Sequence, residues 1–462
     1  MSKLKLTGLV LGLTGFVIPL IVTFPGLSLA GHLAMSIFLM AAVFWMFETI
    51  PIYSTSILVI FSQVTLLSAE GFINYSSVDY TPLPYTEFIA TLADPIIILF
   101  LGGFVLADAS VKYDFDKNLT RILLQPFGKR PKFIMLGLMV VTAVLSAFMS
   151  NTATTAMMIT VILPIIAKME PGDPARIGIA LCVPFAANIG GIATPIGTPP
   201  NAVVIAALNQ QGVDVAFSSW MLYATPLAIV MLIIAWQVLL RLYPPALEII
   251  PLKLDGVLKK SRNAKILYVT FAVTVLLWVT EGLHGIRSSI VALLPVAVLT
   301  LTSAFGKNDI RKLPWEVLWL IAGGIALGIS MKETGLAEWM VGAISWEQFG
   351  YLMLLGVFGG VALVMSNFLS NTVTASLLIP LAISLVTSGI LEGTAGMLMI
   401  GLVIALSASF AMVLPISTPP NAIAVSTGMI QTKHMISAGV IIGIIGIIFV
   451  LILSVVYWPF IV

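Results

Sequence analysis

The sequence predicts an all-α polytopic membrane protein with about 11 transmembrane helices and two re-entrant hairpins. Three observations predict this class: few charged residues, long stretches without charge, and an internal repeat. Of the 462 residues, 59% are hydrophobic and 9% are charged, whereas soluble domains carry about 25% charged residues. The composition therefore excludes a water-soluble enzyme, a disordered protein and a nucleic-acid binder with a basic face. The single cysteine, Cys182, excludes a disulfide framework and a cysteine-rich metal site.

The charge-free stretches place the spans, because a helix needs about 20 apolar residues to cross the hydrocarbon layer. The stretches 133–167 and 348–391 are too long for one span and too short for two. We therefore expect hairpins at 133–167 and 350–391, each of which enters and leaves on one side of the membrane. The predicted spans are 6–25, 32–50, 51–67, 94–110, 177–213, 218–240, 265–283, 287–305, 314–331, 396–431 and 436–458.

The basic residues orient these spans. With the N-terminus inside, 20 of the 22 Lys and Arg residues fall in inner segments, and only Arg287 and Lys332 fall outside. This bias is the one that the positive-inside rule expects. It predicts a protein of the cell inner (plasma) membrane with a cytoplasmic N-terminus and an outer C-terminus. Lys3 and Lys5 before an apolar run also resemble a signal peptide, but the run is long for one, so we expect it to remain as the first span.

The chain contains two near copies of one motif set. Ser-Asn-Thr occurs at 150–152 and 370–372, and Thr-Pro-Pro-Asn occurs at 198–201 and 418–421, with an offset of 220 in both cases. Ser146 and Ser366 keep the same offset, and the copies extend upstream to two Gly-Gly pairs and two Trp-x-x-Glu motifs at 45–48 and 278–281.

The predicted topology inverts between the copies. The first hairpin opens to the inside and the second to the outside, and inverted repeats of this kind build secondary transporters with a site at the repeat interface. The predicted units are a leading span (1–31), a first repeat (32–262) and a second repeat (263–462). The first repeat holds scaffold spans 32–110, an interfacial segment 111–132, hairpin 133–167, broken span 177–213 and span 218–240. The second holds scaffold spans 265–331, hairpin 350–391, broken span 396–431 and span 436–458.

A Ser-Asn-Thr tip deep in the membrane has the chemistry of an anion site. The tip exposes the amide N–H groups that begin the return helix, and these groups and the helix dipole favour an anion. The Asn amide and the Ser and Thr hydroxyls add donors and acceptors. A lone Ser-Asn-Thr is more often a helix cap, but two copies in inverted places favour a functional interpretation.

The Thr-Pro-Pro-Asn motif has the complementary chemistry. Two prolines break a helix and remove two N–H donors, so each span 177–213 and 396–431 should be two half-helices joined by an extended clasp. Freed carbonyls and side-chain oxygens suit sodium, and the new helix N-terminus suits a carboxylate. One tip and one clasp per half predict two cation sites flanking one anion site.

The upstream motifs suggest simpler roles. Trp45 and Trp278 fit interface anchors, and Glu48 and Glu281 at span ends fit caps or anchors better than transport chemistry. The segment 113–131 fits an amphipathic helix on the inner surface, either as a brace for a moving part or as a plain anchor.

The paired tips, paired clasps and Trp-x-x-Glu motifs resemble the divalent anion/sodium symporter family, the INDY-like transporters of dicarboxylates, citrate and sulfate. The resemblance extends from about residue 32 to the C-terminus. It implies an elevator mechanism and a homodimer in the lipid bilayer, with a scaffold formed by the spans before each hairpin. The transport part would contain the hairpins and the spans that follow them.

The resemblance also implies the site residues. Substrate carboxylates would meet Asn151, Thr152, Thr198, Pro199, Ser370, Asn371, Thr372, Thr418 and Pro419. One sodium would bind Ser146, Ser150, Asn151 and Gly197, and the other Ser366, Ser370, Asn371 and Ser417. The clasps differ, since Gly197 stands where the second copy has Ser417. No Arg or Lys is close to either tip in the sequence.

The sequence therefore predicts a sodium-coupled symporter, and not an enzyme, that imports a C4 dicarboxylate such as succinate, malate or fumarate. The alternative is the same fold carrying citrate or sulfate. A cation/proton antiporter should show an acidic residue within the hairpins or clasps, and this chain has none there. An intramembrane enzyme would need a nucleophile–base pair or a metal cluster, and no His or acidic residue is deep enough in the predicted spans. An anion channel is a weaker alternative, which sodium-driven accumulation against a gradient would exclude.

Overall fold

The chain folds into helices alone in the part that the computed structural model describes, residues 2–75, 80–246, 259–391 and 393–461, where an isolated bridge between Ser68 and Leu83 is the single β pairing. Eight helices of this part are long and apolar enough to cross a membrane by length and composition. One arm of the first predicted hairpin, Pro131–Phe148, is among these eight, and the other three hairpin arms are among the shorter apolar helices. The all-α prediction is therefore confirmed.

Outside the hairpins and clasps, the longer helices fall where the sequence predicts spans. In the first half the helices of this group are α1 (Lys3–Ile21), α2 (Leu29–Met46), α3 (Ile52–Leu66), the short α4 (Tyr85–Ala90) and α5 (Pro95–Lys112). In the second half they are α12 (Arg262–Val279), α13 (Glu281–His284), α14 (Ser288–Val291), α15 (Leu293–Leu301), α16 (Lys307–Ile310), α17 (Trp315–Glu333) and α18 (Leu336–Gly342). The short α4, α16 and α18 lie outside the predicted spans, and the predicted span 287–305 is divided into α14 and α15. The halves interlock, since α3 packs on α17 and α5 packs on α14 and α15.

Each Ser-Asn-Thr motif lies at a break between two helices. In the first half α7 (Pro131–Phe148) ends just before the motif and α8 (Asn151–Ile166) begins at its Asn. In the second half α19 (Tyr351–Ser366) and α20 (Asn371–Thr387) are arranged in the same way. Ser370 is the N-cap of α20, because its hydroxyl accepts the Val373 N–H at 3.2 Å.

Each Thr-Pro-Pro-Asn motif begins a second half-helix. The chain leaves α9 (Ala175–Gly191), runs through a break, and enters α10 (Pro199–Gln210); α21 (Gly393–Ser409) and α22 (Pro419–Ser426) repeat the pattern. Both helices start with the two prolines, a position that needs no N–H. Trp220 Nε1 donates to the freed Ile192 carbonyl at 3.0 Å, so this part of the break is held by a side chain.

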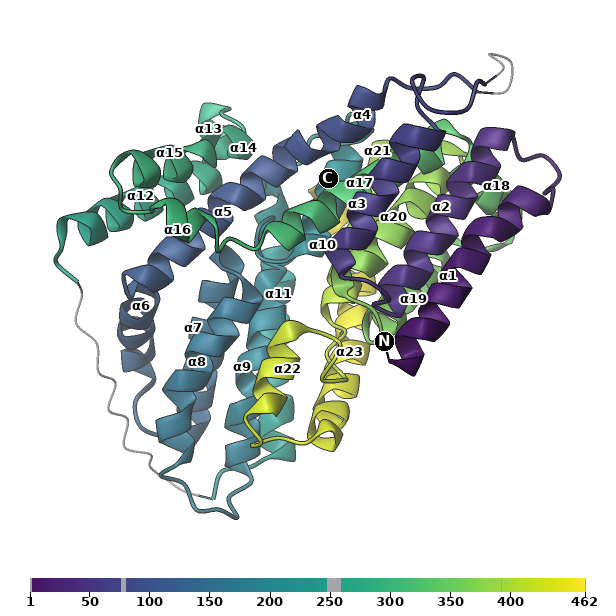
Figure 1. Ribbon diagram of the computed structural model, residues 1–462. Coiled ribbons are helices and arrows are strands. Elements are labelled where there is room, and N and C mark those ends of the chain that lie inside the picture. Colours follow the sequence, from purple (N-terminus) through teal and green to yellow (C-terminus); the bar gives the residue numbers. More distant parts are fainter. Residues whose placement is uncertain (1, 76–79, 247–258, 392, 462) are drawn as a thin grey trace.

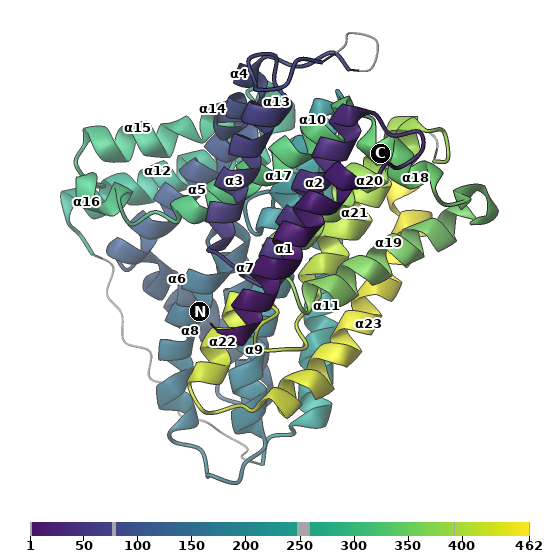
Figure 2. The same cartoon turned by 45° about the vertical axis from the view of Figure 1, so that its right-hand side comes forward.

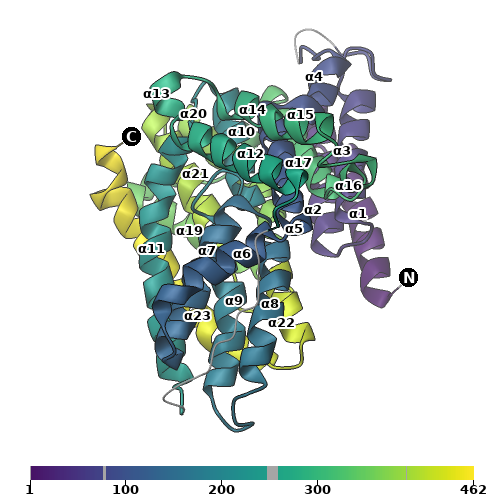
Figure 3. The same cartoon turned by 90° about the vertical axis from the view of Figure 1, so that its left-hand side faces the viewer.

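Two long helices complete the repeats and run antiparallel to each other. These are α11 (Phe217–Leu242) and α23 (Thr432–Val456). Tyr243, just after α11, donates to the His434 carbonyl at the start of α23, and Trp458, after α23, donates to the Tyr223 carbonyl near the start of α11. Their N-termini therefore lie at opposite ends of the molecule. In Figures 1, 2 and 3 the loop between α22 and α23 lies below the end marked N, and α13 lies at the top.

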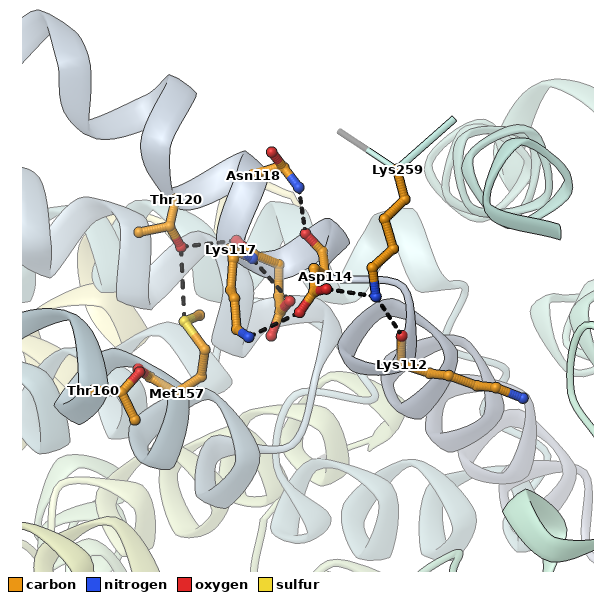
Figure 4. Close-up of polar contacts among 9 residues, drawn as sticks. Lys112, Asp114, Lys117, Asn118, Thr120, Met157, Thr160 and Lys259 are labelled. Atoms are coloured by element: carbon orange, nitrogen blue, oxygen red, sulfur yellow. Dashed lines mark hydrogen bonds and ion pairs between the residues drawn. The ribbon is translucent and has the colours of Figure 1, made fainter. Parts of the chain in front are cut away.

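The link between α5 and the first hairpin is held by ion pairs (Figure 4). It contains α6 (Phe115–Leu124), which is shorter than the interfacial helix predicted at 113–131. Asp114, at the start of α6, pairs with Lys117 at 2.8 Å and with Lys259 at 2.6 Å. The two ammonium groups hold the pKa of the Asp114 carboxyl below its ordinary value. The Asp114–Lys259 ion pair thus connects the segment between α5 and α7 with the residues just before α12.

The expectation that Trp45 and Trp278 are interface anchors is wrong. Their exposed fractions are 2% and 0%, so both rings lie within the protein. Trp45 Nε1 donates to the Ile52 carbonyl at 3.1 Å, and Trp278 Nε1 donates to the Ser288 carbonyl at 3.0 Å. In each half the indole therefore ties the end of its own helix to the start of a following one, α3 in the first half and α14 in the second.

Candidate functional site

Both tips and both clasps line one cavity of about 790 Å³. The opposite wall comes from the start of α3, one face of α5, and the loop into α17. The cavity contains twelve of the predicted site residues, namely Ser150, Asn151, Thr152, Gly197, Thr198, Pro199, Ser370, Asn371, Thr372, Ser417, Thr418 and Pro419. Ser146 and Ser366 do not line it, and both are fully buried.

Four helices begin at this cavity. Asn151, Pro199, Asn371 and Pro419 line it, and they are the first residues of α8, α10, α20 and α22. The first turn of a helix carries the positive end of the helix dipole and has N–H groups without intrahelical partners, although α10 and α22 begin with two prolines and therefore offer fewer N–H donors. The cavity thus concentrates four such ends, which favour negative charge without any basic side chain at the tips.

The first tip and the first clasp meet through oxygen atoms. The Ser146 hydroxyl hydrogen-bonds the Asn151 Oδ1 and also lies 2.8 Å from the Ala187 carbonyl. A Cβ added to Gly191 would lie 2.7 Å from Asn151 Oδ1 and 3.0 Å from the Gly197 carbonyl, so backbone and amide oxygens crowd there. One hydroxyl hydrogen serves two acceptors at this point, which leaves oxygen lone pairs available for a cation.

Asn201 holds the shape of the first clasp from beneath. Its Nδ2 donates to the Thr194 carbonyl at 2.8 Å and lies 3.2 Å from the Gly191 carbonyl. Thr194 in turn donates to the Ala147 carbonyl of the tip. Asn201 therefore fixes the extended segment between α9 and α10 and does not line the cavity.

The second tip and clasp are joined by a residue that sequence reasoning missed, Asn367. Ser417 Oγ lies 3.1 Å from both the carbonyl and the Oδ1 of Asn367, and Val413 N–H donates to the same Oδ1 at 2.9 Å. Its counterpart at the offset of 220 is Ala147, so comparing the repeats could not find it.

The second tip region contains buried side-chain oxygens without hydrogen-bond partners. Among the residues that the structure describes, Ser366 Oγ and Asn371 Oδ1 are buried and form no hydrogen bond. A buried polar atom without a partner is costly, and such atoms are uncommon in native proteins. These two belong to the residues predicted to bind the second sodium, so an oxygen-seeking cation would satisfy them.

Asn188 joins the two halves inside the cavity wall, and sequence reasoning missed it as well. Its Nδ2 donates to Thr418 Oγ1 at 3.1 Å and lies 3.4 Å from Asn421 Oδ1. The first-half helix α9 thereby supports the second-half clasp. The counterpart of Asn188 at the offset of 220 is Ala408, so the repeat gave no signal here either.

Three charged residues also line the cavity: Asp108, Lys312 and Glu316. Lys312 corrects the expectation that no basic residue is near the tips, because the loop into α17 folds back over the cavity. Lys312 and Glu316 are exposed, and Asp108 is partly buried. No group of three or more His, Cys, Asp or Glu side chains in the described part could hold a metal ion.

Comparisons with known proteins support a transporter. The model of a family described as "Citrate transporter" matches residues 42–400 and 275–462. A sodium-dependent dicarboxylate transporter of Staphylococcus saprophyticus is 30% identical, over 98% of this chain and 91% of that protein. Sodium-dependent high-affinity dicarboxylate transporter 3 of Caenorhabditis elegans is 31% identical, over 87% of this chain and 79% of that protein.

Two solved structures share the fold. The YdaH transporter of Alcanivorax borkumensis has a TM-score of 0.56 at 13% identity, over 88% of this chain and 97% of that one. MtrF of Neisseria gonorrhoeae has a TM-score of 0.55 at 10% identity, over 88% and 94%. At these identities the likeness concerns the fold alone.

Proposed function

Because this chain belongs to the citrate transporter family, and is thus a membrane transporter and not an enzyme, we propose that it is a sodium-coupled symporter that imports C4 dicarboxylates such as succinate, malate and fumarate. The observation that carries the proposal is the single cavity in which both Ser-Asn-Thr tips and both Thr-Pro-Pro-Asn clasps meet. Relatives named as sodium-dependent dicarboxylate transporters support the choice of cation and substrate class.

The substrate carboxylates bind between the two tips. One carboxylate accepts hydrogen bonds from Asn151, Thr152 and Thr198 and contacts the ring of Pro199, which has no N–H to donate. The other accepts hydrogen bonds from Ser370, Asn371, Thr372 and Thr418 and contacts the ring of Pro419. Four helix N-termini stabilise the two negative charges in a wall whose charged members are Asp108, Lys312 and Glu316, none of which belongs to a tip or a clasp. This arrangement fits a small dianion because each half supplies one equivalent set of donors.

Sodium is co-transported and completes the charge balance. The first ion binds oxygens of Ser146, Ser150, Asn151 and Gly197, and the second binds oxygens of Ser366, Ser370, Asn371 and Ser417. The unpartnered Ser366 Oγ and Asn371 Oδ1 support the second site. Since Asn151 and Asn371 belong to both the tips and the sodium sites, binding of sodium orients the same amides that meet the substrate. This sharing explains coupling between the two.

The protein moves by an elevator mechanism as a homodimer in the plasma membrane, with 11 spans, two re-entrant hairpins, a cytoplasmic N-terminus and an outer C-terminus. The scaffold comprises spans 32–110 and 265–331, and the transport part comprises the hairpins and the helices after them. The packing of α10 on α20 and α21, and of α22 on α8 and α9, supports a transport part built from both halves as one body.

Uptake into proteoliposomes tests the proposal. Labelled succinate should accumulate when sodium is higher outside, and replacing sodium by choline should abolish the accumulation. Sodium-independent uptake at an unchanged rate would refute sodium coupling.

Citrate is a specific second candidate, because Lys312 lines the cavity and could pair with a third carboxylate. A competition panel of succinate, malate, fumarate, citrate and sulfate separates the candidates. Stronger inhibition by citrate than by succinate would reverse their order.

A further inference from the structure

Glu281 joins two parts of the chain on the upper side of the molecule. Its carboxylate accepts the Phe217 N–H at 2.7 Å through Oε2 and the Ser288 N–H at 3.1 Å through Oε1, and the residue is only 9% exposed. Phe217 is the first residue of α11, a helix of 26 residues. The carboxylate of α13 therefore caps the positive end of α11.

Other contacts reinforce this cap. The Phe217 ring stacks on Trp278 with centroids 5.2 Å apart, and Arg287 pairs with Asp214 at 2.8 Å. Trp278 and Glu281 are the two fixed residues of the second Trp-x-x-Glu motif. The motif thus connects α12 and α13 with the start of α11.

The first Trp-x-x-Glu motif has the same indole contact but a free carboxylate. Trp45 Nε1 reaches the start of α3 as Trp278 Nε1 reaches the start of α14. Glu48 is exposed and forms no hydrogen bond or ion pair with any residue that the structure describes. A Cβ added to Gly8 would touch Phe47 and Thr49, so Glu48 lies level with the first turns of α1, near the end marked N in Figure 1.

The helix that would be the partner of Glu48 by repeat symmetry is α23, since α23 is the second-half counterpart of α11. Gln431 and His434 cap each other at its start, where the Gln431 N–H donates to His434 Nδ1 at 3.2 Å. The N–H of the exposed Thr432, however, has no partner among the described residues, and Lys433 adds a positive charge beside it. In all three views the start of α23 lies below the end marked N, so the two do not meet in this conformation.

We propose that Glu281 and Glu48 are alternating caps that hold the two end conformations: Glu281 caps α11 in the conformation described here, and Glu48 caps α23 in the opposite one. The inference rests on the elevator movement proposed above. Inverted repeats exchange their conformations between the two end states. An upward movement of the transport part that brings α23 to Glu48 carries the start of α11 away from Glu281.

A pair of cysteines reports which cap is closed. A Cβ added to Gly282 would lie 3.8 Å from Ser218 Oγ, so Gly282→Cys with Ser218→Cys should cross-link readily in the present conformation. Ile50→Cys with Lys433→Cys, a pair that leaves Glu48 in place, should cross-link only in the opposite conformation. Both pairs are measured in proteoliposomes without substrate, so the readout does not depend on uptake.

The two glutamates should shift the reporter in opposite directions. Glu281→Gln keeps the shape but leaves one acceptor for two N–H groups, and the cross-linking rate of the Gly282/Ser218 pair should fall about tenfold. Glu48→Gln should raise that rate and should slow the cross-linking of the Ile50/Lys433 pair. Glu338→Gln, an exposed acidic residue of α18, is the matched control and should change neither.

The proposal is overturned if Glu281→Gln leaves the Gly282/Ser218 rate unchanged in protein of normal thermal stability. It is also overturned if the Ile50/Lys433 pair never cross-links while uptake is normal. Loss of sodium-driven uptake in the unmutated protein, with opposite shifts of the reporter preserved, would instead refute the proposed function and leave the alternating caps in place.

Discussion

Replacing Asn371 by Ala separates binding from folding. The Asn371 Oδ1 is buried without a partner in the described part of the chain, whereas the Asn151 Oδ1 accepts a hydrogen bond from Ser146. An unpaired buried polar atom costs about 1–3 kcal/mol, and a paired one contributes about 0.5–1.5 kcal/mol. In sodium-free buffer, Asn371→Ala should therefore leave the free energy of unfolding unchanged or raise it, while Asn151→Ala should lower it by about 1 kcal/mol.

In sodium, Asn371→Ala should instead be less stable than the unmutated protein. An ion that binds only the folded protein stabilises it by RT ln(1 + [L]/Kd), which is about 1.4 kcal/mol per site at about 100 mM sodium for a Kd of about 10 mM. The unmutated protein gains this term at each site, and Asn371→Ala should lose the term of the second site. The measurement is the thermal unfolding midpoint in choline chloride and in sodium chloride, together with succinate uptake.

The result that refutes the reasoning is specific. If Asn371→Ala keeps the full sodium-induced rise of the unfolding midpoint, the unpartnered oxygen is not a sodium ligand. If instead it loses as much stability in choline as Asn151→Ala does, the oxygen has a structural partner and the argument from its isolation fails.

Three further predictions use other contacts. Gly324→Ala places a Cβ 2.9 Å from the Cβ of Ser376 and still closer to the Ser376 hydroxyl, so the overpacking should cost about 1–3 kcal/mol and slow uptake at least tenfold. In the control, Gly328→Ala, the new Cβ would lie 3.6 Å from Pro380, so uptake should not slow. Asp114→Asn should lower the free energy of unfolding at pH 7 by less than about 1 kcal/mol, because the ion pairs are exposed. Since the folded pKa of Asp114 is lowered from 3.8, this difference in stability is present above pH 3.8 and disappears as the pH falls through the lowered pKa. It should also shrink in concentrated KCl. Lys312→Gln should weaken inhibition by citrate more than uptake of succinate, and Lys307→Gln, outside the cavity, should change neither.

The sequence predicted the tips and clasps because their signal is local. A Pro-Pro pair cannot continue a helix but can begin a new one, as it does at α10 and α22. Ser-Asn-Thr in a charge-free stretch marks a break that the structure places between α7 and α8 and between α19 and α20. The repeat then shows that both motifs recur at one offset. Convergence of all four segments on one cavity follows from tertiary packing, which no spacing along the chain contains.

The residues that the sequence did not reveal are those in which the two halves differ. Asn367 and Asn188 have alanines as their counterparts, and Lys312 lies on a loop more than a hundred residues from the first tip. Each acts through a contact between segments distant in the chain, such as Asn188 with Thr418. A repeat detects what two halves share, so the asymmetric features required the structure.

The scarcity of charge and the inverted repeat have one physical explanation. A single tip and clasp supply two helix N-termini, which suit one carboxylate, and a dicarboxylate needs two such sets facing each other. The second-half helix α22 packs on α8 and α9, and the first-half helix α10 packs on α20 and α21. Each clasp is thus supported by the other half, so neither half can form its site alone. In the proposed function, four helix dipoles fixed by mutual packing take the place of an arginine or lysine at the tips, and they avoid the cost of burying a charged side chain in the membrane.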